Sequence, residues 1–237
     1  MVTLTYQERF KTLSRVFDEF TNRTIFELQK RGLFDELVTP LFVGKESNVF
    51  IAKKKDQKVI VKIYFMQNCN FNKMYDYIKK DPRYEFLKKH RRQIIVSWTQ
   101  REYKNLLRAE KAKVRVPKAL GWRNHILVEE FIGKEKPAEP LKDSLPTDPE
   151  RFFKEIIHQM KLLYRSGLIH GDLSSFNILN NEETPVLIDF SQATLTKTPN
   201  SEELLERDLT NILKFFKKLG ISADYTKIYK EITGKQK

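Results

Sequence analysis

Hydrophobic and polar positions follow two different periods along the chain. Between residues 39 and 65, β-branched and aromatic runs are separated by a glycine turn and by the polar run KKKDQK, which predicts three antiparallel strands. Two more extended segments follow at 114–122 and 125–132. Beyond the next prolines, apolar residues recur every three or four positions, which predicts helices ending at Gly167 and Gly220. A strand-rich first half therefore precedes a helical second half.

Two further helical patterns lie in the first half. The opening segment places apolar residues such as Phe10 and Leu13 at helical spacing, and so does the run IIVSWTQREYKNLLRAEKA. These elements together predict an α+β fold of two lobes. In this layout a nucleotide binds in the cleft between the lobes. The predicted parts are an N-terminal helical extension (1–38), an N-lobe (39–132), an inter-lobe connection (133–149) and a reduced, mainly helical C-lobe (150–237).

One charge, Lys62, interrupts the apolar strand VIVKIY. Burying an unpaired ammonium costs on the order of several kcal/mol, so this side chain requires an anion. Glu102, on the helix that follows, is the partner we expect, and Glu110 on the same helix is the alternative. A strand lysine paired with a helix glutamate resembles the pair that orients nucleotide phosphates in protein kinases.

The run HGDLSSFN places polar side chains at the spacing of the protein-kinase catalytic loop. Asp172 is placed to orient or deprotonate an acceptor hydroxyl, and Asn177 to hold a metal ion. Asp189, at the end of PVLID, takes the place of the aspartate whose metal bridges the phosphates of ATP. Such a set supplies oxygen ligands for Mg²⁺ (or Mn²⁺) and one carboxylate at the acceptor. We expect His170 to fix this loop by packing and hydrogen bonding.

The turn VGKESNV gives a weaker signal. Gly44 allows the backbone to approach phosphate groups, and Lys45 and Ser47 offer further donors. An ordinary hairpin turn is the simpler explanation of this run taken alone.

Several families of phosphotransferases share the catalytic-loop motif, including aminoglycoside phosphotransferases and a small kinase of tRNA modification. The runs GKESNVF, VKIY, LVEEFIGKEKPAEPLKD, HGDLSSFNIL and LIDFSQA together resemble the RIO family of atypical serine/threonine protein kinases, over about residues 11–220. The chain is most similar to the first subfamily, which has one kinase domain and no winged helix. It has HGD where that pattern has HAD, and it lacks the GxGxxG loop, APE segment and activation loop of ordinary protein kinases.

The resemblance implies a protein-kinase-like fold and a defined ATP site. The adenine is expected to bond to the backbone of Glu130 and Ile132, between apolar walls at Val49 and Ile188. A flexible loop is expected at 68–92. The family also implies autophosphorylation on serine or threonine, ATP hydrolysis and a role in maturation of the small ribosomal subunit.

Lysine and arginine outnumber aspartate and glutamate by 13, which favours polyanionic partners such as RNA. Between Lys73 and Arg92 there are eight basic residues, interleaved with aromatic ones. That composition suits phosphate contacts and base stacking, and a solvated loop explains it equally well. Pre-ribosomal RNA or a small-subunit particle is the expected partner beside ATP, and the sequence does not identify a protein substrate.

No run approaches the roughly 20 apolar residues of a membrane span and no signal peptide is evident, so we expect a cytoplasmic protein. A single cysteine, Cys69, excludes an internal disulfide.

Three functions fit these residues. The first is a Mg²⁺-dependent serine/threonine kinase, and the second is an RNA-bound assembly factor in which ATP hydrolysis times release. The third, a small-molecule kinase, requires an acidic acceptor pocket, for which Asp208 is the main hint. Because no peptide-binding segment is evident, phosphorylation of Asp189 itself is a further hypothesis.

Overall fold

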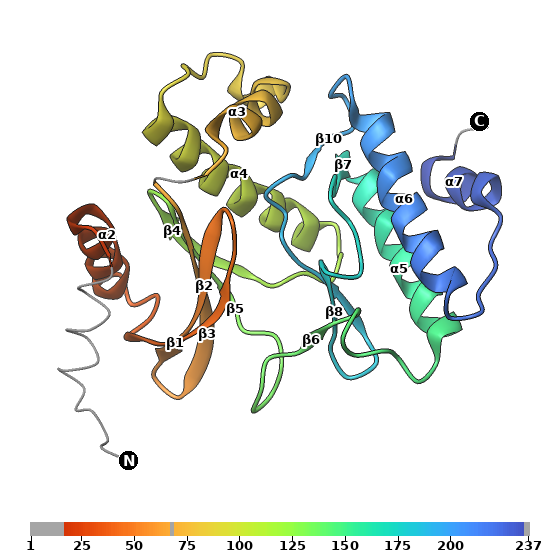
Figure 1. The fold of residues 1–237 in the computed structure, drawn as a ribbon, viewed down its shortest axis with the longest axis horizontal. Coiled ribbons are helices and arrows are strands. Elements are labelled where there is room, and N and C mark those ends of the chain that lie inside the picture. The colour runs from red at the N-terminus through yellow and green to blue at the C-terminus, as the bar shows by residue number, and fades with distance from the viewer. Residues whose placement is uncertain (1–16, 67–68, 235–237) are drawn as a thin grey trace.

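The computed structural model describes residues 17–66 and 69–234 and has two halves (Figure 1). A sheet with flanking helices forms the N-terminal half, and α5, α6 and α7 dominate the C-terminal half. The α+β, two-lobed fold that we expected is therefore confirmed. The helical pattern through Phe10 and Leu13 lies outside the described residues.

The N-lobe sheet is antiparallel, with the strand order β1-β2-β3-β5-β4. The polar run KKKDQK forms the turn between the second and third strands. The predicted meander and the two later extended segments all lie in this sheet. The strands are β1 (Glu36–Val43), β2 (Ser47–Lys54), β3 (Gln57–Tyr64), β4 (Ala119–Arg123) and β5 (Ile126–Glu130).

Helices cover both faces of this sheet. On one face, Ile25 and Leu28 of α2 (Glu19–Lys30) pack with alternate residues of β3 and β5, because side chains of a strand point alternately to its two faces. Asp18 caps α2, where its carboxylate accepts a hydrogen bond from Thr21 N at 2.8 Å. The other face is turned toward α4 (Arg91–Lys111) and the C-lobe (Figure 1).

The segment expected to be a flexible loop contains regular structure among its described residues. Helix α3 (Phe71–Lys79) and the 3₁₀ turn η1 (Pro82–Tyr84) precede α4. Met74 and Ile78 of α3 are buried against Trp98 of α4. The apolar residues hidden among the lysines therefore anchor this segment to the N-lobe.

The C-lobe is built on α5 (Pro149–Arg165) and α6 (Ser201–Lys217), as the periodicity predicted, and on α7 (Tyr225–Thr233). Asp148 caps α5 by accepting a hydrogen bond from Arg151 N at 3.0 Å. Short strands in front of these helices carry the catalytic loop and pair as β6-β8-β9 and β7-β10. They are β6 (Glu139–Pro140), β7 (Leu168–Ile169), β8 (Ile178–Asn180), β9 (Pro185–Leu187) and β10 (Thr194–Leu195).

Strand β1 forms an outer edge of the N-lobe sheet. Pro40 lies in its middle, and the register with β2 shifts on both sides of this proline. Val38, Leu41, Phe42 and Val43 of this strand are exposed, and the last two are 63% and 70% accessible. Within the described part of the chain, no helix is both long and apolar enough to cross a membrane.

Candidate active site

The face of the N-lobe sheet that is turned toward the C-lobe carries the candidate nucleotide site. Lys62 of β3 lies opposite Val49 of β2 and Leu127 of β5. Directly opposed residues point to the same face of an antiparallel sheet, and so do residues two apart on one strand. Ile60 and its partner Glu129 therefore share this face with Lys62.

Lys62 is buried, with 8% of its surface accessible, and is bonded to two carboxylates. Its Nζ donates to Glu102 Oε1 at 2.8 Å and to Asp189 Oδ1 at 3.0 Å. Burial by itself would lower the pKa of Lys62, but Asp189 and Glu102 raise it well above its usual value, so the ammonium stays charged. Tyr64 also donates its hydroxyl to Glu102. The structure thus places Glu102, not Glu110, on the strand lysine.

A buried carboxylate from α6 holds the catalytic loop. Asp208 accepts hydrogen bonds from Gly171 N at 2.7 Å and from Leu173 N at 2.8 Å. These bonds fix the backbone on both sides of Asp172, whose own carboxylate accepts from Gln192 Nε2 at 3.1 Å. Asp208 is only 1% exposed and serves the loop, so it does not form the acidic acceptor pocket that a small-molecule kinase would require.

The candidate metal ligands lie on either side of this loop. Asn177 Nδ2 donates to the Asp172 carbonyl at 2.8 Å, so its carboxamide oxygen stays an acceptor. Asp189 has a left-handed backbone, with φ of 61°. Burial opposes the ionisation of Asp189, yet Lys62 and a hydrogen bond from Ser191 lower its pKa to about 2. An ionised carboxylate and an amide oxygen are the kind of ligand that Mg²⁺ prefers, so these two residues fit the ion.

No cluster of three or more histidine, cysteine or acidic residues among the described residues forms a metal centre by itself. The pair Asn177 and Asp189 would therefore need phosphate and water oxygens to complete an octahedral shell, which is how Mg²⁺ binds at nucleotide sites.

His170 supports the loop rather than titrating near neutrality. Its Nε2 lies 2.9 Å from the Ile188 carbonyl, an acceptor, so this nitrogen carries the proton. Burial lowers the pKa of His170 to about 4, and its ring centroid lies 4.8 Å from that of Phe190. A neutral imidazole therefore links the catalytic loop to the segment that carries Asp189.

The turn between β1 and β2 lies near this site, since the charges of Asp189, Lys62 and Asp172 act on its Glu46. Gly44 N donates to Ser47 O at 2.9 Å, and a Cβ at Gly44 would lie 2.9 Å from that same oxygen, so no larger residue fits without a shift. Lys45 is exposed and Ser47 is buried. Glu46 lies between them and is partly buried. Its pKa is raised mainly by burial and, to a smaller extent, by the negative charge of Asp189. Glu46 was not among the site residues predicted from the sequence.

The residues expected at the adenine are the last residue of β5, Glu130, and Ile132 just beyond it. Glu130 N already donates a hydrogen bond to Lys118 O at 2.9 Å, just before β4. Ile132 O accepts from Ala138 N at 2.9 Å, whereas Ile132 N has no hydrogen-bond acceptor among the described residues. Val49 and Ile188, the expected walls, are both partly exposed. One free backbone donor beside partly exposed apolar side chains is an arrangement that suits a planar base.

Glu129 was also not among the site residues predicted from the sequence. It is 9% exposed, and burial followed by the charge of Glu102 raises its pKa to about 8. The sequence signal was that two glutamates, Glu129 and Glu130, follow one another in the run LVEEF. Only the pairing of β5 with β3 shows that this side chain faces the cleft.

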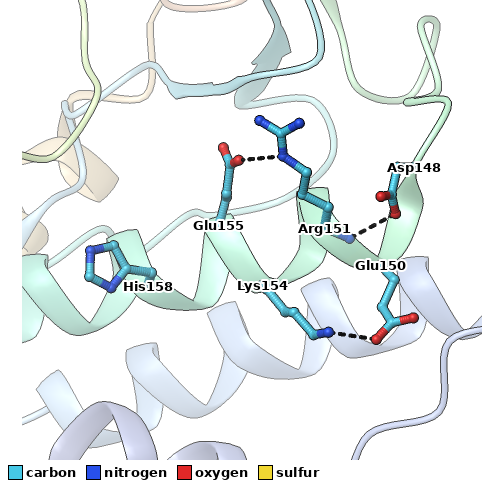
Figure 2. A pocket seen from close by; sticks show the side chains of 6 residues that line it. All are labelled: Asp148, Glu150, Arg151, Lys154, Glu155 and His158. Atoms are coloured by element: carbon cyan, nitrogen blue, oxygen red, sulfur yellow. Dashed lines mark hydrogen bonds and ion pairs between the residues drawn. The ribbon is translucent and has the colours of Figure 1, made fainter.

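A hollow of about 490 Å³ lies elsewhere, over the first turns of α5 (Figure 2). Lys154 and Glu150 form an ion pair at 2.6 Å in it, and Arg151 and Glu155 form another at 3.2 Å. None of the predicted site residues lines this hollow, and its charged side chains already bind one another.

The two-lobed fold, with Lys62 between Glu102 and Asp189 and beside the Asp172 loop, defines a protein of the protein-kinase-like class. A solved structure of this class, the Rio2 kinase–ADP/Mg²⁺–phosphoaspartate complex from Chaetomium thermophilum, superposes with a TM-score of 0.70 at 21% identity. The superposition covers 90% of this chain and 65% of that one, and it supports the fold.

Sequence comparisons give the family. The RIO domain matches residues 48–228. The RIO-type serine/threonine-protein kinase Rio1 of Methanocaldococcus jannaschii is 42% identical over 233 residues, which cover 98% of this chain and 80% of the relative. Rio1 of Thermoplasma acidophilum is 37% identical over 188 residues, 79% of this chain and 100% of the relative. The chain belongs to the RIO family of atypical serine/threonine protein kinases and is Rio1-like, with a single kinase domain.

Proposed function

We propose that the chain uses Mg²⁺ and ATP to phosphorylate serine or threonine hydroxyls, including its own. The carrying observation is that one buried ammonium, Lys62, bonds to both Glu102 and Asp189. A lysine in this position leaves Asp189 for the nucleotide phosphates when they bind, while Glu102 keeps it oriented.

Each polar group in the cleft has a distinct role. Lys62 holds the α- and β-phosphates, and the backbone of Glu130 and Ile132 binds the adenine edge. Gly44, Lys45 and Ser47 cover the phosphates from above. Asp172 orients the acceptor hydroxyl and takes its proton as the oxygen–phosphorus bond forms, since burial and then Asp189 raise the pKa of this carboxyl.

Asn177 and Asp189 would hold the metal ion. Bound Mg²⁺ would neutralise the charge that develops on the phosphate oxygens. The ionised state of Asp189 and the free amide oxygen of Asn177 support this assignment.

A second outcome of the same site is favoured by one comparison. The Chaetomium Rio2 structure is described as a complex with ADP, Mg²⁺ and phosphoaspartate. In this chain, the corresponding reaction would join an Asp189 carboxylate oxygen to the γ-phosphorus as the bond to ADP breaks. Water would then cleave the acyl phosphate, releasing inorganic phosphate and restoring the carboxylate. The net reaction would be ATP hydrolysis.

Incubation with γ-labelled ATP and Mg²⁺ separates these outcomes. Label that resists hydroxylamine and is recovered as phosphoserine or phosphothreonine supports hydroxyl transfer. Label that hydroxylamine releases, and that Asp189→Asn abolishes, supports the acyl phosphate. If the chain with Mg²⁺ forms neither product and releases no phosphate, the proposal is wrong.

A role in maturation of the small ribosomal subunit, with RNA as partner, rests on the family and on charge. Seven lysine and arginine side chains of the segment 68–92 are exposed. Lys73 lies close enough to Asp172 for its charge to lower the pKa of that carboxyl, and the other six are Lys79, Lys80, Lys88, Lys89, Arg91 and Arg92. Several aromatic rings of the segment lie against cations within the chain, as Tyr75 does with Lys79 and Lys89. These basic side chains therefore suit phosphate contacts, and base stacking is left mainly to Phe86, which is 89% exposed.

A further inference from the structure

A carboxyl group without a partner among the described residues lies on the face of the N-lobe sheet that carries Lys62. Glu129 is nine-tenths buried, and its side chain makes no hydrogen bond or ion pair with any residue that the structure describes. Its carboxylate oxygens are not among the fully enclosed, unpartnered side-chain atoms of the described residues, so the carboxyl group is open on one side and can bond to a ligand. Lys62, the nearest candidate partner, is already bonded to Glu102 and Asp189.

The sheet register places this carboxyl beside the expected base rather than beside the phosphates. Glu129 directly precedes Glu130, whose backbone is the first expected contact of the adenine, and it lies opposite Ile60. Ile60, like Val49, is an only partly buried apolar residue on the cleft face. A planar base against these side chains would present its edge to the end of β5.

The 6-amino group of adenine has two N–H donors. A single backbone carbonyl, such as that of Glu130, accepts a hydrogen bond from only one of them in good geometry. A carboxyl group is rich in acceptors and suits the other. Guanine and hypoxanthine carry an acceptor oxygen at this position, which would oppose the acceptor oxygens of an ionised carboxyl group.

We propose that Glu129 accepts a hydrogen bond from the 6-amino group of adenine and is a specificity-determining residue for ATP, an inference that rests on the ATP site proposed above. The groups whose charges act on Glu129 are Glu102 from α4, Lys62 from β3 and Asp189 from the segment after β9. Above pH 8 this carboxyl is ionised and can only accept hydrogen bonds.

The test is calorimetric titration of the full chain at pH 9 with Mg²⁺ and either ATP or ITP, whose base carries oxygen in place of the 6-amino group. Glu129→Gln keeps an acceptor oxygen and adds an N–H donor that can bond to the oxygen of ITP. We expect it to bind ITP about tenfold more tightly than the wild type while ATP binding changes little. Because this result is a gain of binding, misfolding cannot produce it.

Glu129→Met removes the hydrogen-bond acceptor and is expected to weaken ATP binding about tenfold. The preference of the protein for ATP over ITP should therefore become smaller. Glu110→Met, on α4, is the matched control and should leave both affinities unchanged. If ATP binds but Glu129→Gln leaves ITP affinity unchanged, Glu129 does not read the base. If the wild type binds neither nucleotide, the proposed ATP site fails, and this inference fails with it.

Discussion

Asp172, the proposed acceptor of the substrate proton, makes different contacts with its side chain and with its backbone. Its carboxylate accepts from Gln192, while its carbonyl accepts from Asn177. A change confined to the carboxylate therefore spares the bond that orients Asn177. The two functions of this residue can be separated by experiment.

Asp172→Asn should lower phosphoryl transfer by about 100-fold or more, the scale of a positioned acid–base group, because the amide cannot take the acceptor proton. ATP affinity should stay near that of the wild type, since Lys62, Asn177 and Asp189 are unchanged. Single-turnover transfer and equilibrium ATP binding measure the two quantities. A parallel loss of ATP binding would instead indicate that the carboxylate supports the loop.

Glu129 should make folding stability depend on pH. Its pKa rises from 4.5 to about 8 in the folded chain, first because of burial and then because of Glu102. The folded state therefore holds a proton that the unfolded state has released between these values. The stabilisation is complete below about pH 4.5 and is lost as the pH rises to 8 and slightly beyond.

Glu129→Gln removes this dependence, since an amide does not titrate. Urea unfolding of both proteins from pH 5 to 9 should show the wild type losing stability relative to the variant as the pH rises. A constant difference across that range would show that Glu129 has an ordinary pKa.

At the scale of elements, a buried ion cluster joins the segment 68–92 to the residues after Asp189. Asp81, which is fully buried, binds Arg83 at 2.6 Å and Arg101 at 3.2 Å. Arg101 also donates to Ser191 O at 2.8 Å. Asp81 therefore links η1 to the middle of α4, and Arg101 links α4 to the segment after Asp189.

Asp81→Asn should lower the free energy of unfolding by about 3–5 kcal/mol, because it leaves the fully buried Arg101 without its counter-charge. Urea denaturation measures the loss. Asp76→Asn, an exposed carboxylate on α3, is the matched control and should change stability by less than about 0.5 kcal/mol. Equal effects of the two substitutions would argue against a structural role for the cluster.

At the scale of the whole molecule, exposed basic residues of the segment 68–92 are open to a large partner. Six of them are considered for RNA contact: Lys79, Lys80, Lys88, Lys89, Arg91 and Arg92. If they contact RNA phosphates, each contact releases counterions and adds about 0.7–0.9 to the slope of log affinity against log salt. Changing all six to serine should flatten that slope by several units in a filter-binding titration with ribosomal RNA. ATP affinity should not change, and an unchanged slope would remove this segment from RNA binding.

The limits of sequence reasoning are clear in particular residues. Lys62 and Glu102 could be paired in advance because a lysine in an apolar strand requires a counter-charge. Glu129 could not be placed, since its meaning depends on the register between two strands far apart in sequence. Helix α3 had a readable signal in Phe71, Met74 and Ile78, but the surrounding lysines dominated the interpretation. Strands of two or three residues, such as β7, are too short to show any period.

The exposed outer strand β1 has a consequence for the protein at high concentration. A free strand edge with apolar side chains invites a second chain to add to the sheet, which is how many proteins begin to aggregate. Pro40 has no amide hydrogen to offer at the middle of this edge, and the irregular register on both sides of it makes the edge uneven. We therefore expect Pro40 to hinder the addition of a second strand at this edge.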